Sequence, residues 1–480
     1  MRKIEKGNSS LRRGISTAIV AVIIVILVLA VGAGVYYYTT TTISPATTTA
    51  TSVGSTTVTS VGSTTVTSVV TKTPTQAPVT ITVWETYAPA TTPQSEFGAF
   101  NKSLSAFEAA YPYITVNVET QPFGSAVSAF TTASLANSAP DVMRLANDQI
   151  GAMVAEGFLT PINQFGNSTF FSTYTPNSMK DFQYGPAGQY WGLPENINGL
   201  ALYYNKALVP TPPTTTNQLI SMAQSITKTD STGKITTAGI VFNAAGGFGG
   251  AYWWWPFLDG FGGSVFNATG YPTLNSSAAV QSVEWLNNLT TSSKVMPPGV
   301  DYGTADTLFI SGHAGMMING PWDLSTYLGN TSLNIGVTSL PTVSSTGKPL
   351  APFLGAQGWV IASGKPLAEQ LAAWDFISFV TNFNSQKNLV TMAGDLPSNV
   401  ALGSDPSVTS NPYAVGFLAQ AALSVPAVNT PQMSVVYADI GGPLGTAQPT
   451  SATTPITPAQ IQTALNNAEA ACLRDIGAIA

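Results

Sequence analysis

The sequence predicts an α/β protein of two lobes, and three observations support this expectation. The chain has 480 residues, which is more than one hydrophobic core usually holds, so two or more globular units are expected. Between residues 79 and 120 a strand-like alternation, a helical repeat and a second alternation follow one another, as in a β-α-β unit. Further on, residues 191–216 contain a turn-forming segment, a short apolar run and a second turn-forming segment. This pattern is typical of a chain that passes between two lobes.

The N-terminal segment is predicted to lie outside the globular fold. A basic flank, residues 1–14, precedes an uncharged apolar run, residues 15–38. At about 1.5 Å per residue this run can span a hydrocarbon core of roughly 30 Å. Basic residues before the run and three tyrosines at its end predict a cytoplasmic N-terminus and an extracellular remainder. A cleaved secretory signal is the alternative, but its apolar region would be shorter and would end in small residues.

Residues 39–78 are predicted to form a disordered stalk. They are nearly all Thr, Ser, Val, Pro and Ala, and the sequence TSVGSTTV occurs twice in succession from Thr51 and Thr59. Such a segment lacks the large apolar side chains needed to offset the entropy of ordering. Asn-x-Ser/Thr sequons beyond it fit a glycoprotein surface outside the cell. The predicted glycosylation sites are Asn101, Asn167, Asn267, Asn275, Asn288 and Asn330.

Composition excludes several classes of function. Five of the 17 basic residues and one of the 23 acidic residues precede Gly14, which leaves 12 basic and 22 acidic residues in the outer part. Nucleic acid is therefore not an expected partner. One Cys and one His argue against a disulfide framework, a zinc cluster and a His-dependent catalytic set, and no cofactor is expected. So few carboxylates would also suit an acidic exterior.

Several segments together resemble a known family. Residues 204–215 read YNKALVPTPPTT, and residues 140–162 carry Pro-Asp, a second Asp and Gly-x-Leu-x-x-Ile at spaced positions. Residues 308–322 read LFISGHAGMMINGPW, and residues 431–434 read PQMS. In this order they resemble the extracellular solute-binding proteins of ABC importers, specifically the maltodextrin-binding-protein type.

The resemblance implies a two-lobed, periplasmic-binding-protein-like fold over about residues 79–476. Its lobes are made of discontinuous pieces: residues 79–197 and 354–397 for lobe 1, and residues 198–353 and 398–480 for lobe 2. Three crossings join the lobes, at residues 195–199, 352–355 and 396–398. Bending at these crossings would close the lobes on a ligand, whose contacts with both lobes shift the open and closed populations.

The N-terminus carries a further resemblance. Arg12-Arg13-Gly14, directly before the apolar run, resembles the prepilin-type signal of archaeal sugar-binding proteins. That likeness implies cleavage between Gly14 and Ile15, which would leave the apolar helix on the mature protein. An uncut signal anchor is the alternative. Both place the C-terminal part on the cell surface, anchored in the cell membrane.

A sugar site needs flat rings for the apolar faces of a pyranose and polar side chains for its rim of hydroxyls. Such residues occur where predicted strands end, in the first crossing and in the segments that resemble the family. The candidate ligand residues are Trp84, Glu85, Asp148, Asn196, Asn198, Tyr252, Trp253, Trp322, Asp323, Trp359 and Tyr437.

Some of these candidates come with alternatives. Three successive tryptophans, Trp253 to Trp255, cannot all face one pocket, because neighbours on a strand or helix point in different directions. Tyr252 and one of the first two tryptophans are expected to face the ligand, and Trp255 is expected in the core. Trp359 is either a stacking ring or a core residue. Asn198 and Gly250 stand where maltodextrin binders often carry acidic groups, so glucose-like monosaccharides and short oligosaccharides are both candidate ligands.

The sequence thus predicts a membrane-anchored extracellular protein that binds a monosaccharide or short oligosaccharide without altering it. It would deliver the sugar to the permease subunits of an ABC transporter. A membrane-tethered glycoside hydrolase is one alternative, because Glu85 and Asp148 could lie the roughly 5–10 Å apart that glycoside hydrolysis needs. A pilin-like structural protein of the cell surface is another, and only the N-terminal signal suggests it.

Overall fold

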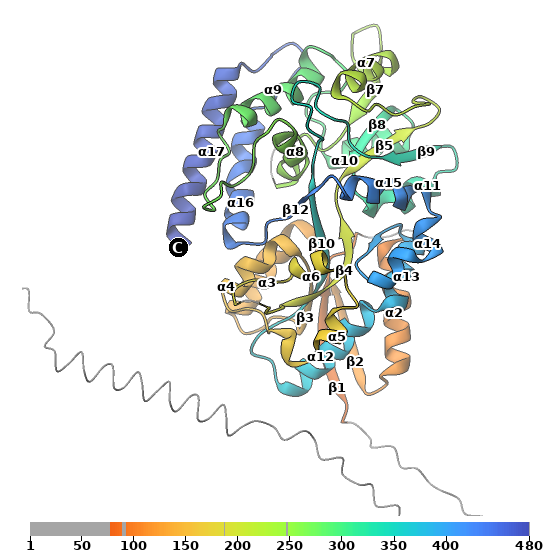
Figure 1. Cartoon of the computed structure of the whole chain (residues 1–480), viewed down its shortest axis with the longest axis vertical. Helices are drawn as coiled ribbons and strands as arrows, with labels where there is room; N and C mark the ends of the chain where they lie inside the picture. The colour runs from red at the N-terminus through yellow and green to blue at the C-terminus, as the bar shows by residue number, and fades with distance from the viewer. Residues whose placement is uncertain (1–76, 89–92, 187, 246–247, 480) are drawn as a thin grey trace, which may run out of the picture. The chain divides into compact units, whose positions relative to one another are not determined.

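Two β-sheets, each with its own helices, organise the chain in the computed structural model, which describes residues 77–88, 93–186, 188–245 and 248–479 (Figure 1). Residues 76–480 form one compact unit. The predicted anchor and signal cleavage site lie outside the described residues, as does nearly all of the predicted stalk. Among the residues described, no helix is both long and apolar enough to cross a membrane.

The first sheet is mixed and has the strand order β11-β4-β10-β3-β1-β2, with β12 beside β10. β1 (Val79–Glu85) pairs in parallel with β2 (Ile114–Thr120) and with β3 (Val142–Ala146). Because α2 (Glu96–Ala110) connects β1 to β2, the predicted β-α-β unit is confirmed. The remaining strands are β4 (Gly192–Asn198), β10 (Phe353–Ile361), β11 (Leu396–Pro397) and β12 (Val425–Pro426).

Helices cover both faces of the first sheet and make a separate core on each. On one face α2 packs with α12 (Leu367–Val380), where the rings of Phe107 and Phe376 meet edge to face at 5.3 Å. On the other face α3 (Phe123–Leu135) buries Phe130 completely. The other helices of this part are η1 (Asn147–Gln149), α4 (Ile150–Ala155), η2 (Ile162–Gln164), α5 (Ser168–Phe171), α6 (Pro176–Lys180) and α13 (Phe383–Met392).

The second sheet has the order β6-β7-β8-β5-β9 and a core of its own. β5 (Ala201–Asn205) follows β4 after two residues but belongs to this sheet, so the chain passes between lobes there, as predicted. β8 (Ala314–Asn319) is buried at every residue. The other strands are β6 (Lys228–Thr229), β7 (Ile235–Val241) and β9 (Ile335–Thr338).

Figure 1 shows α8, α9, α16 and α17 gathered on one side of the second sheet, where they pack on one another. These four helices are α8 (Phe248–Gly260), α9 (Ser277–Thr291), α16 (Pro431–Thr446) and α17 (Pro458–Ile479). The remaining helices are α7 (Thr216–Ile226), α10 (Tyr302–Ile310), η3 (Pro321–Asp323), α11 (Leu324–Gly329), η4 (Val400–Ser404), α14 (Pro406–Thr409) and α15 (Pro412–Ala421).

One expectation about the first crossing is wrong. A turn was expected before the apolar run, but residues 192–198 form β4, which lies between β10 and β11. The strand accommodates Pro194 at a β-bulge. Gly358 of β10 pairs with Pro194 and Gln357 pairs with Asn196, so Glu195 has no partner residue on β10. On the other side, β11 pairs only with Ile197 and Asn196, so the missing N–H of the proline costs no ladder bond there. The skipped residue, Glu195, has a buried side chain.

Candidate functional site

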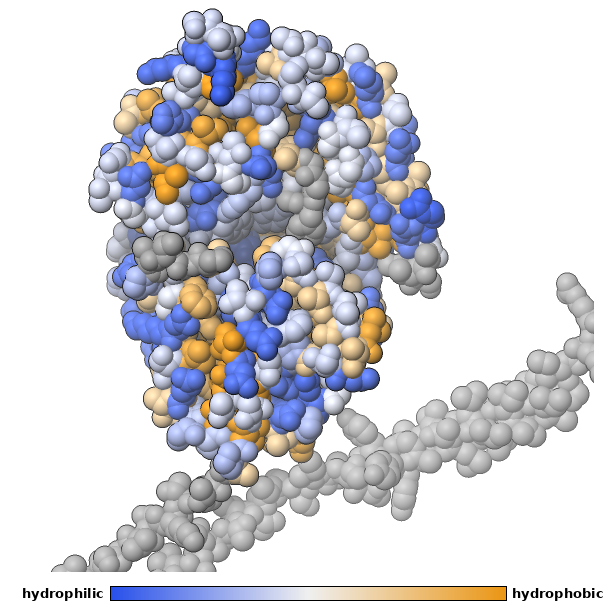
Figure 2. Space-filling model, turned by 180° about the vertical axis from the view of Figure 1, so that it is seen from behind, coloured by the Kyte–Doolittle hydropathy of each residue, from blue (hydrophilic) through white to orange (hydrophobic). Residues whose placement is uncertain are grey.

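The surface is hollowed between the first lobe and the second lobe, as Figure 2 shows. Direct contacts connect the two lobes. Ser434 of α16 donates to Gln149 of the first lobe at 3.2 Å, and the Asn429 side chain donates to the backbone oxygens of Asp181 at 3.1 Å and Gln183 at 2.6 Å. Side chains from both lobes therefore meet in this region.

The second lobe contributes a cluster of aromatic rings. Tyr252 on α8 and Trp322 on η3 lie with ring centroids 6.5 Å apart, and both are half-buried, so each keeps ring surface exposed. Trp253 packs edge-on against both rings, at 5.5 Å and 6.3 Å, and is itself buried. The Trp322 ring lies directly over Gly320, where any Cβ would overlap it. Glycine at that position therefore lets the ring lie flat against the backbone.

A polar edge adjoins the Trp322 ring. The Tyr302 hydroxyl accepts a hydrogen bond from Trp322 Nε1 at 2.8 Å and donates to the Asp323 carboxylate. Asn319 Nδ2 donates to Asp323 Oδ2 at 2.8 Å. Burial raises the pKa of Asp323, and these hydrogen bonds oppose the shift. A flat ring and a carboxylate thus lie side by side in fixed positions.

The first lobe contributes Asp148, which is half-buried on η1. Its side chain is hydrogen bonded to Tyr437 of α16, and burial raises its pKa to about 6. The Tyr437 hydroxyl also accepts from Trp255 Nε1 at 3.3 Å. Burial raises the pKa of Tyr252, and the charge of Asp148 raises it further, so the acid of the first lobe acts on a ring of the second lobe.

The sequence of the region that carries this site matches a described family. Residues 102–414 match the family of bacterial extracellular solute-binding proteins. The chain belongs to this family. The match covers most of both lobes, and the family resemblance seen in the short segments of the sequence is thereby confirmed.

Relatives of this solute-binding protein are named for the sugars that they bind. It is 26% identical to the maltotriose-binding protein of Pyrococcus abyssi over 75% of this chain and 76% of the relative. It is also 26% identical to the maltodextrin-binding protein MdxE of Bacillus subtilis, over 68% of this chain and 76% of that protein. A galactooligosaccharide-binding protein of Bacillus subtilis is 24% identical, over 70% and 78%. These are binding proteins and not enzymes.

Solved structures show the same two-lobed fold. The maltose/maltodextrin-binding domain MalE of Bdellovibrio bacteriovorus, bound to maltotriose, is 25% identical, with a TM-score of 0.75 over 83% of this chain and all of that one. The maltotriose-binding protein of Thermus thermophilus gives a TM-score of 0.71 over the same share of this chain, at 24% identity. The predicted two-lobed α/β architecture of this solute-binding protein is therefore confirmed.

Five predicted ligand residues of this solute-binding protein are buried, namely Glu85, Asn196, Trp253, Trp359 and Tyr437. Two of them, Trp359 and Glu85, have no exposed surface, and the structure corrects both. Trp359 is fully buried in the centre of the first sheet, where its ring stacks on Phe100 at 5.5 Å and its Nε1 donates to Glu195 at 3.0 Å. Glu85 is also fully buried, and its carboxylate accepts from the Tyr87 N–H at 2.6 Å and from the Thr120 hydroxyl. Neither side chain has a surface left for a ligand.

Three further candidates, Trp84, Asn196 and Asn198, belong to strands of the first sheet. Trp84 is half-buried at the end of β1, packs edge-on against Phe130 at 6.5 Å and donates to Glu119 at 2.8 Å. Asn196 is buried and bonded within the protein, whereas Asn198 is half-buried opposite Gly355. The role of Trp84 and Asn198 toward a ligand stays a prediction, whereas the buried Asn196 is engaged by Asp395.

The three successive tryptophans on α8 all turn inward. Trp253 donates its indole N–H to the Ile318 oxygen at 2.8 Å, so it supports Tyr252 and Trp322 from behind. Trp254 donates to Ser282 at 2.8 Å and is buried. The prediction that Trp255 packs in the core is confirmed, since only 2% of it is exposed.

The sequons differ in accessibility, and their glycosylation stays a prediction. Three of the asparagines are exposed, and three are half-buried. The exposed ones are Asn101, Asn167 and Asn267, and the half-buried ones are Asn275, Asn288 and Asn330. Asn330 donates its side-chain amide to the Ile310 oxygen at 2.7 Å, so a glycan there would require this bond to break.

Sequence analysis missed Tyr302, which holds both Trp322 and Asp323 in place. Its position directly after Asp301, the residue that caps α10, is the only local signal in the sequence. That signal predicts the start of a helix and says nothing about the loop that packs against it. Among the described residues, no group of three or more His, Cys, Asp or Glu side chains could hold a metal ion.

Proposed function

We propose that this protein is a cell-surface sugar-binding protein that captures a short oligosaccharide of the maltotriose type between its lobes and delivers it to an ABC importer. One observation carries this proposal. The second lobe holds the half-buried rings of Tyr252 and Trp322 together, and the charge of Asp148 on the first lobe acts on Tyr252, so an aromatic surface and an acid are contributed by different lobes. The names of the relatives, which bind maltotriose and maltodextrin, support the choice of sugar.

The chemistry of the site supports a sugar over other small solutes. The rings offer flat apolar faces to the C–H surface of a pyranose, while Asp148 and Asp323 offer carboxylate oxygens to its hydroxyls. A sugar hydroxyl that lacked such a partner in a closed site would cost about 1–3 kcal/mol, so these acids would set which sugar fits. Glucose-like monosaccharides would contact fewer of the rings and are expected to bind more weakly.

One of the two acids considered for glycoside hydrolysis is not accessible to a ligand. Glycoside hydrolysis requires two carboxyl groups beside the scissile bond. Of the pair considered from the sequence, Glu85 is fully buried with both carboxylate oxygens engaged in hydrogen bonds. Binding without chemical change therefore agrees best with the site.

We further propose that residues 15–38 anchor the protein in the membrane and that residues 39–78 form a stalk that holds the lobes outside the cell. The apolar run and its basic flank in the sequence support the anchor, and the cut would fall between Gly14 and Ile15. A relative in Streptococcus pneumoniae is named as a solute-binding lipoprotein of a maltooligosaccharide ABC transporter, so membrane attachment has a precedent among the relatives. The permease subunits of such a transporter would be the protein partner.

The test of sugar binding uses residues 77–480 with maltotriose, maltose, glucose and a galactooligosaccharide, by thermal shift and titration calorimetry. Maltotriose at 100 times its Kd should add about 2.7 kcal/mol to the free energy of unfolding. Tyr252→Ala should lose most of the affinity, while Tyr271→Ala, which changes an exposed tyrosine of the same lobe, should keep it. Failure of the whole panel to bind, or release of shorter sugars from maltotriose, would overturn the proposal.

A further inference from the structure

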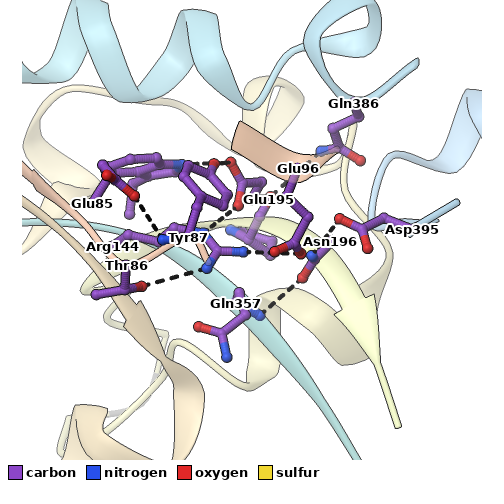
Figure 3. A network of polar contacts seen from close by, with 12 residues as sticks. Glu85, Thr86, Tyr87, Glu96, Arg144, Glu195, Asn196, Gln357, Gln386 and Asp395 are labelled. Carbon is purple, nitrogen blue, oxygen red and sulfur yellow. Dashed lines mark hydrogen bonds and ion pairs between the residues drawn. The ribbon is translucent and has the colours of Figure 1, made fainter. Parts of the chain in front are cut away.

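A cluster of buried charged groups lies inside the first lobe (Figure 3). Arg144 of β3 pairs with Glu195 at 2.7 Å and with Glu96 at 3.5 Å. Glu85 and Asp395 are buried beside them, at 0% and 1% exposure. The charge of Arg144 acts on all four of these carboxyl groups. Full ionisation would leave negative charge uncompensated in the interior, so the cluster must hold protons.

Glu96 and Asp395 interact with each other within this cluster. Asp395 Oδ1 is buried and has no donor unless the Glu96 carboxyl is protonated. The two side chains are hydrogen bonded to each other, which two carboxylates cannot be without a shared proton. Burial raises the pKa of both groups, and the charge of Asp395 raises the pKa of Glu96 further, although Arg144 opposes both shifts. We call these two residues the carboxyl pair.

The carboxyl pair is connected to all three segments that cross between the lobes. Asp395 directly precedes β11, and its Oδ2 accepts from Asn196 Nδ2 of β4 at 2.9 Å. Asn196 Oδ1 in turn accepts from the Gln357 N–H of β10 at 3.2 Å. Figure 3 shows Asp395, Asn196 and Gln357 connected in this order. The neighbouring Gly394 packs so closely on Leu324 of the second lobe that a Cβ would overlap it, so a shift of this loop would reach that lobe directly.

We propose that Glu96 and Asp395 are positioning residues for sugar capture, and that their shared proton holds the three crossing segments in the lobe arrangement seen here. Loss of this proton to solvent would leave two carboxylates at hydrogen-bonding distance, with Arg144 already engaged by Glu195. Asp395 would then move away from Glu96 and release Asn196. Lobe opening would become easier as the pH rises. Tyr87, which donates its hydroxyl to Glu195, and Tyr203, whose pKa is raised by burial and in part by the charge of Asp395, are further titratable groups at the cluster.

The carboxyl pair is proposed to control lobe motion. This inference rests on the proposed function only for its effect on sugar affinity. Its test therefore measures the distance between the lobes without sugar. Spin labels on Ser105→Cys of α2 and Gln281→Cys of α9, both exposed positions, report that distance by pulsed electron resonance. We expect a narrow distance distribution in acid and a broader one in alkali. Each unit by which the pKa of the pair differs between lobe arrangements shifts their equilibrium about tenfold.

Two isosteric variants and one control test the mechanism. In Glu96→Gln and in Asp395→Asn the amide donates the hydrogen bond at every pH, so each variant should keep the narrow distribution throughout. Glu108→Gln, an exposed change on the same helix, should behave like the parent protein. Difference infrared spectra of the unlabelled protein should show a protonated carboxyl band that Glu96→Gln and Asp395→Asn lose.

The outcomes separate this inference from the proposed function. Interlobe distances that do not change with pH, or that broaden equally in Glu96→Gln, would overturn the role of the carboxyl pair. Distances that respond to pH in a protein that binds no maltotriose would support the pair as a control of lobe motion and reject the proposed sugar. If the variants fail to fold, absence of the carboxyl band from the parent spectrum would still overturn the inference.

Discussion

The Tyr302 hydroxyl accepts the indole N–H of Trp322 at 2.8 Å and donates to the carboxylate of Asp323. A single phenol on α10 therefore fixes both a ring and an acid of the candidate sugar site. The orientation of these two side chains is then set before any ligand arrives, which lowers the entropy that binding would otherwise cost.

Tyr302→Phe keeps the ring that packs edge-on against Trp253 at 5.7 Å but removes both hydrogen bonds. We expect the affinity for maltotriose to fall about tenfold, because each lost bond is worth about 0.5–1.5 kcal/mol. Titration calorimetry measures the affinity, and thermal unfolding checks that the fold persists. Tyr271→Phe, at an exposed position, is the control. Equal affinity in Tyr302→Phe and the parent would show that Tyr302 does not position the site.

The close approach of Trp322 to Gly320 makes a second prediction. Gly320→Ala places a methyl group where the Trp322 ring lies, so the ring must move away from the backbone. We expect maltotriose affinity to fall by an order of magnitude or more, since the overlap is with a rigid ring. Gly329→Ala is the matched control, because a Cβ at residue 329 would meet nothing within 4 Å. A maltotriose affinity lowered equally in both variants would contradict this account.

Buried acids predict how the free energy of unfolding depends on pH. Burial raises the pKa of Asp148 from 3.8 to about 6 and that of Asp181 from 3.8 to about 8. Between the unfolded pKa of each acid and its raised folded pKa, the folded chain binds more protons than the unfolded chain. The free energy of unfolding therefore falls as the pH rises through that range. We expect urea unfolding to give a larger free energy near about pH 5 than near about pH 8.

The contribution of Asp148 can be isolated. Asp148→Asn should flatten the slope between about pH 4 and about pH 6, by an amount on the order of 2 kcal/mol. Glu108→Gln, an exposed change, should leave the slope as it is. A stability that falls steeply from pH 6 to pH 3 in the parent protein would contradict the prediction, and with it the idea that the sequence suits an acidic exterior.

The start of α17 gives a prediction about stability alone. Thr457 Oγ1 accepts from the Gln460 N–H at 3.3 Å, and Gln460 Oε1 accepts from the Thr457 N–H at 2.9 Å. This is a capping box, which the Thr-x-x-Gln sequence favours. Thr457→Ala should cost about 1 kcal/mol of unfolding free energy and leave maltotriose affinity unchanged. Thr463→Ala, within the same helix, should cost less, because alanine favours a helix interior. Equal losses in the two variants would argue against the cap.

Local pattern alone was enough to predict several elements of this protein. The alternation of β1, the repeat of α2 and the cap of α17 each depend on residues within one or two turns of one another. The buried stripe of α17, from Ile461 to Cys472, follows from the same spacing. Short-range geometry decides these features, so the sequence determines them.

The candidate site and the carboxyl pair depend on contacts that no local pattern contains. Asp148 is hydrogen bonded to Tyr437. Asp395 accepts from Asn196, which lies 199 positions away in the sequence. Trp359, which the sequence left open as a stacking ring or a core residue, shows the physical reason. Its strand lies inside a sheet covered on both faces, so an alternating pattern cannot tell which side faces a ligand. Only the packing of distant helices and strands decides which rings and acids remain open to a sugar.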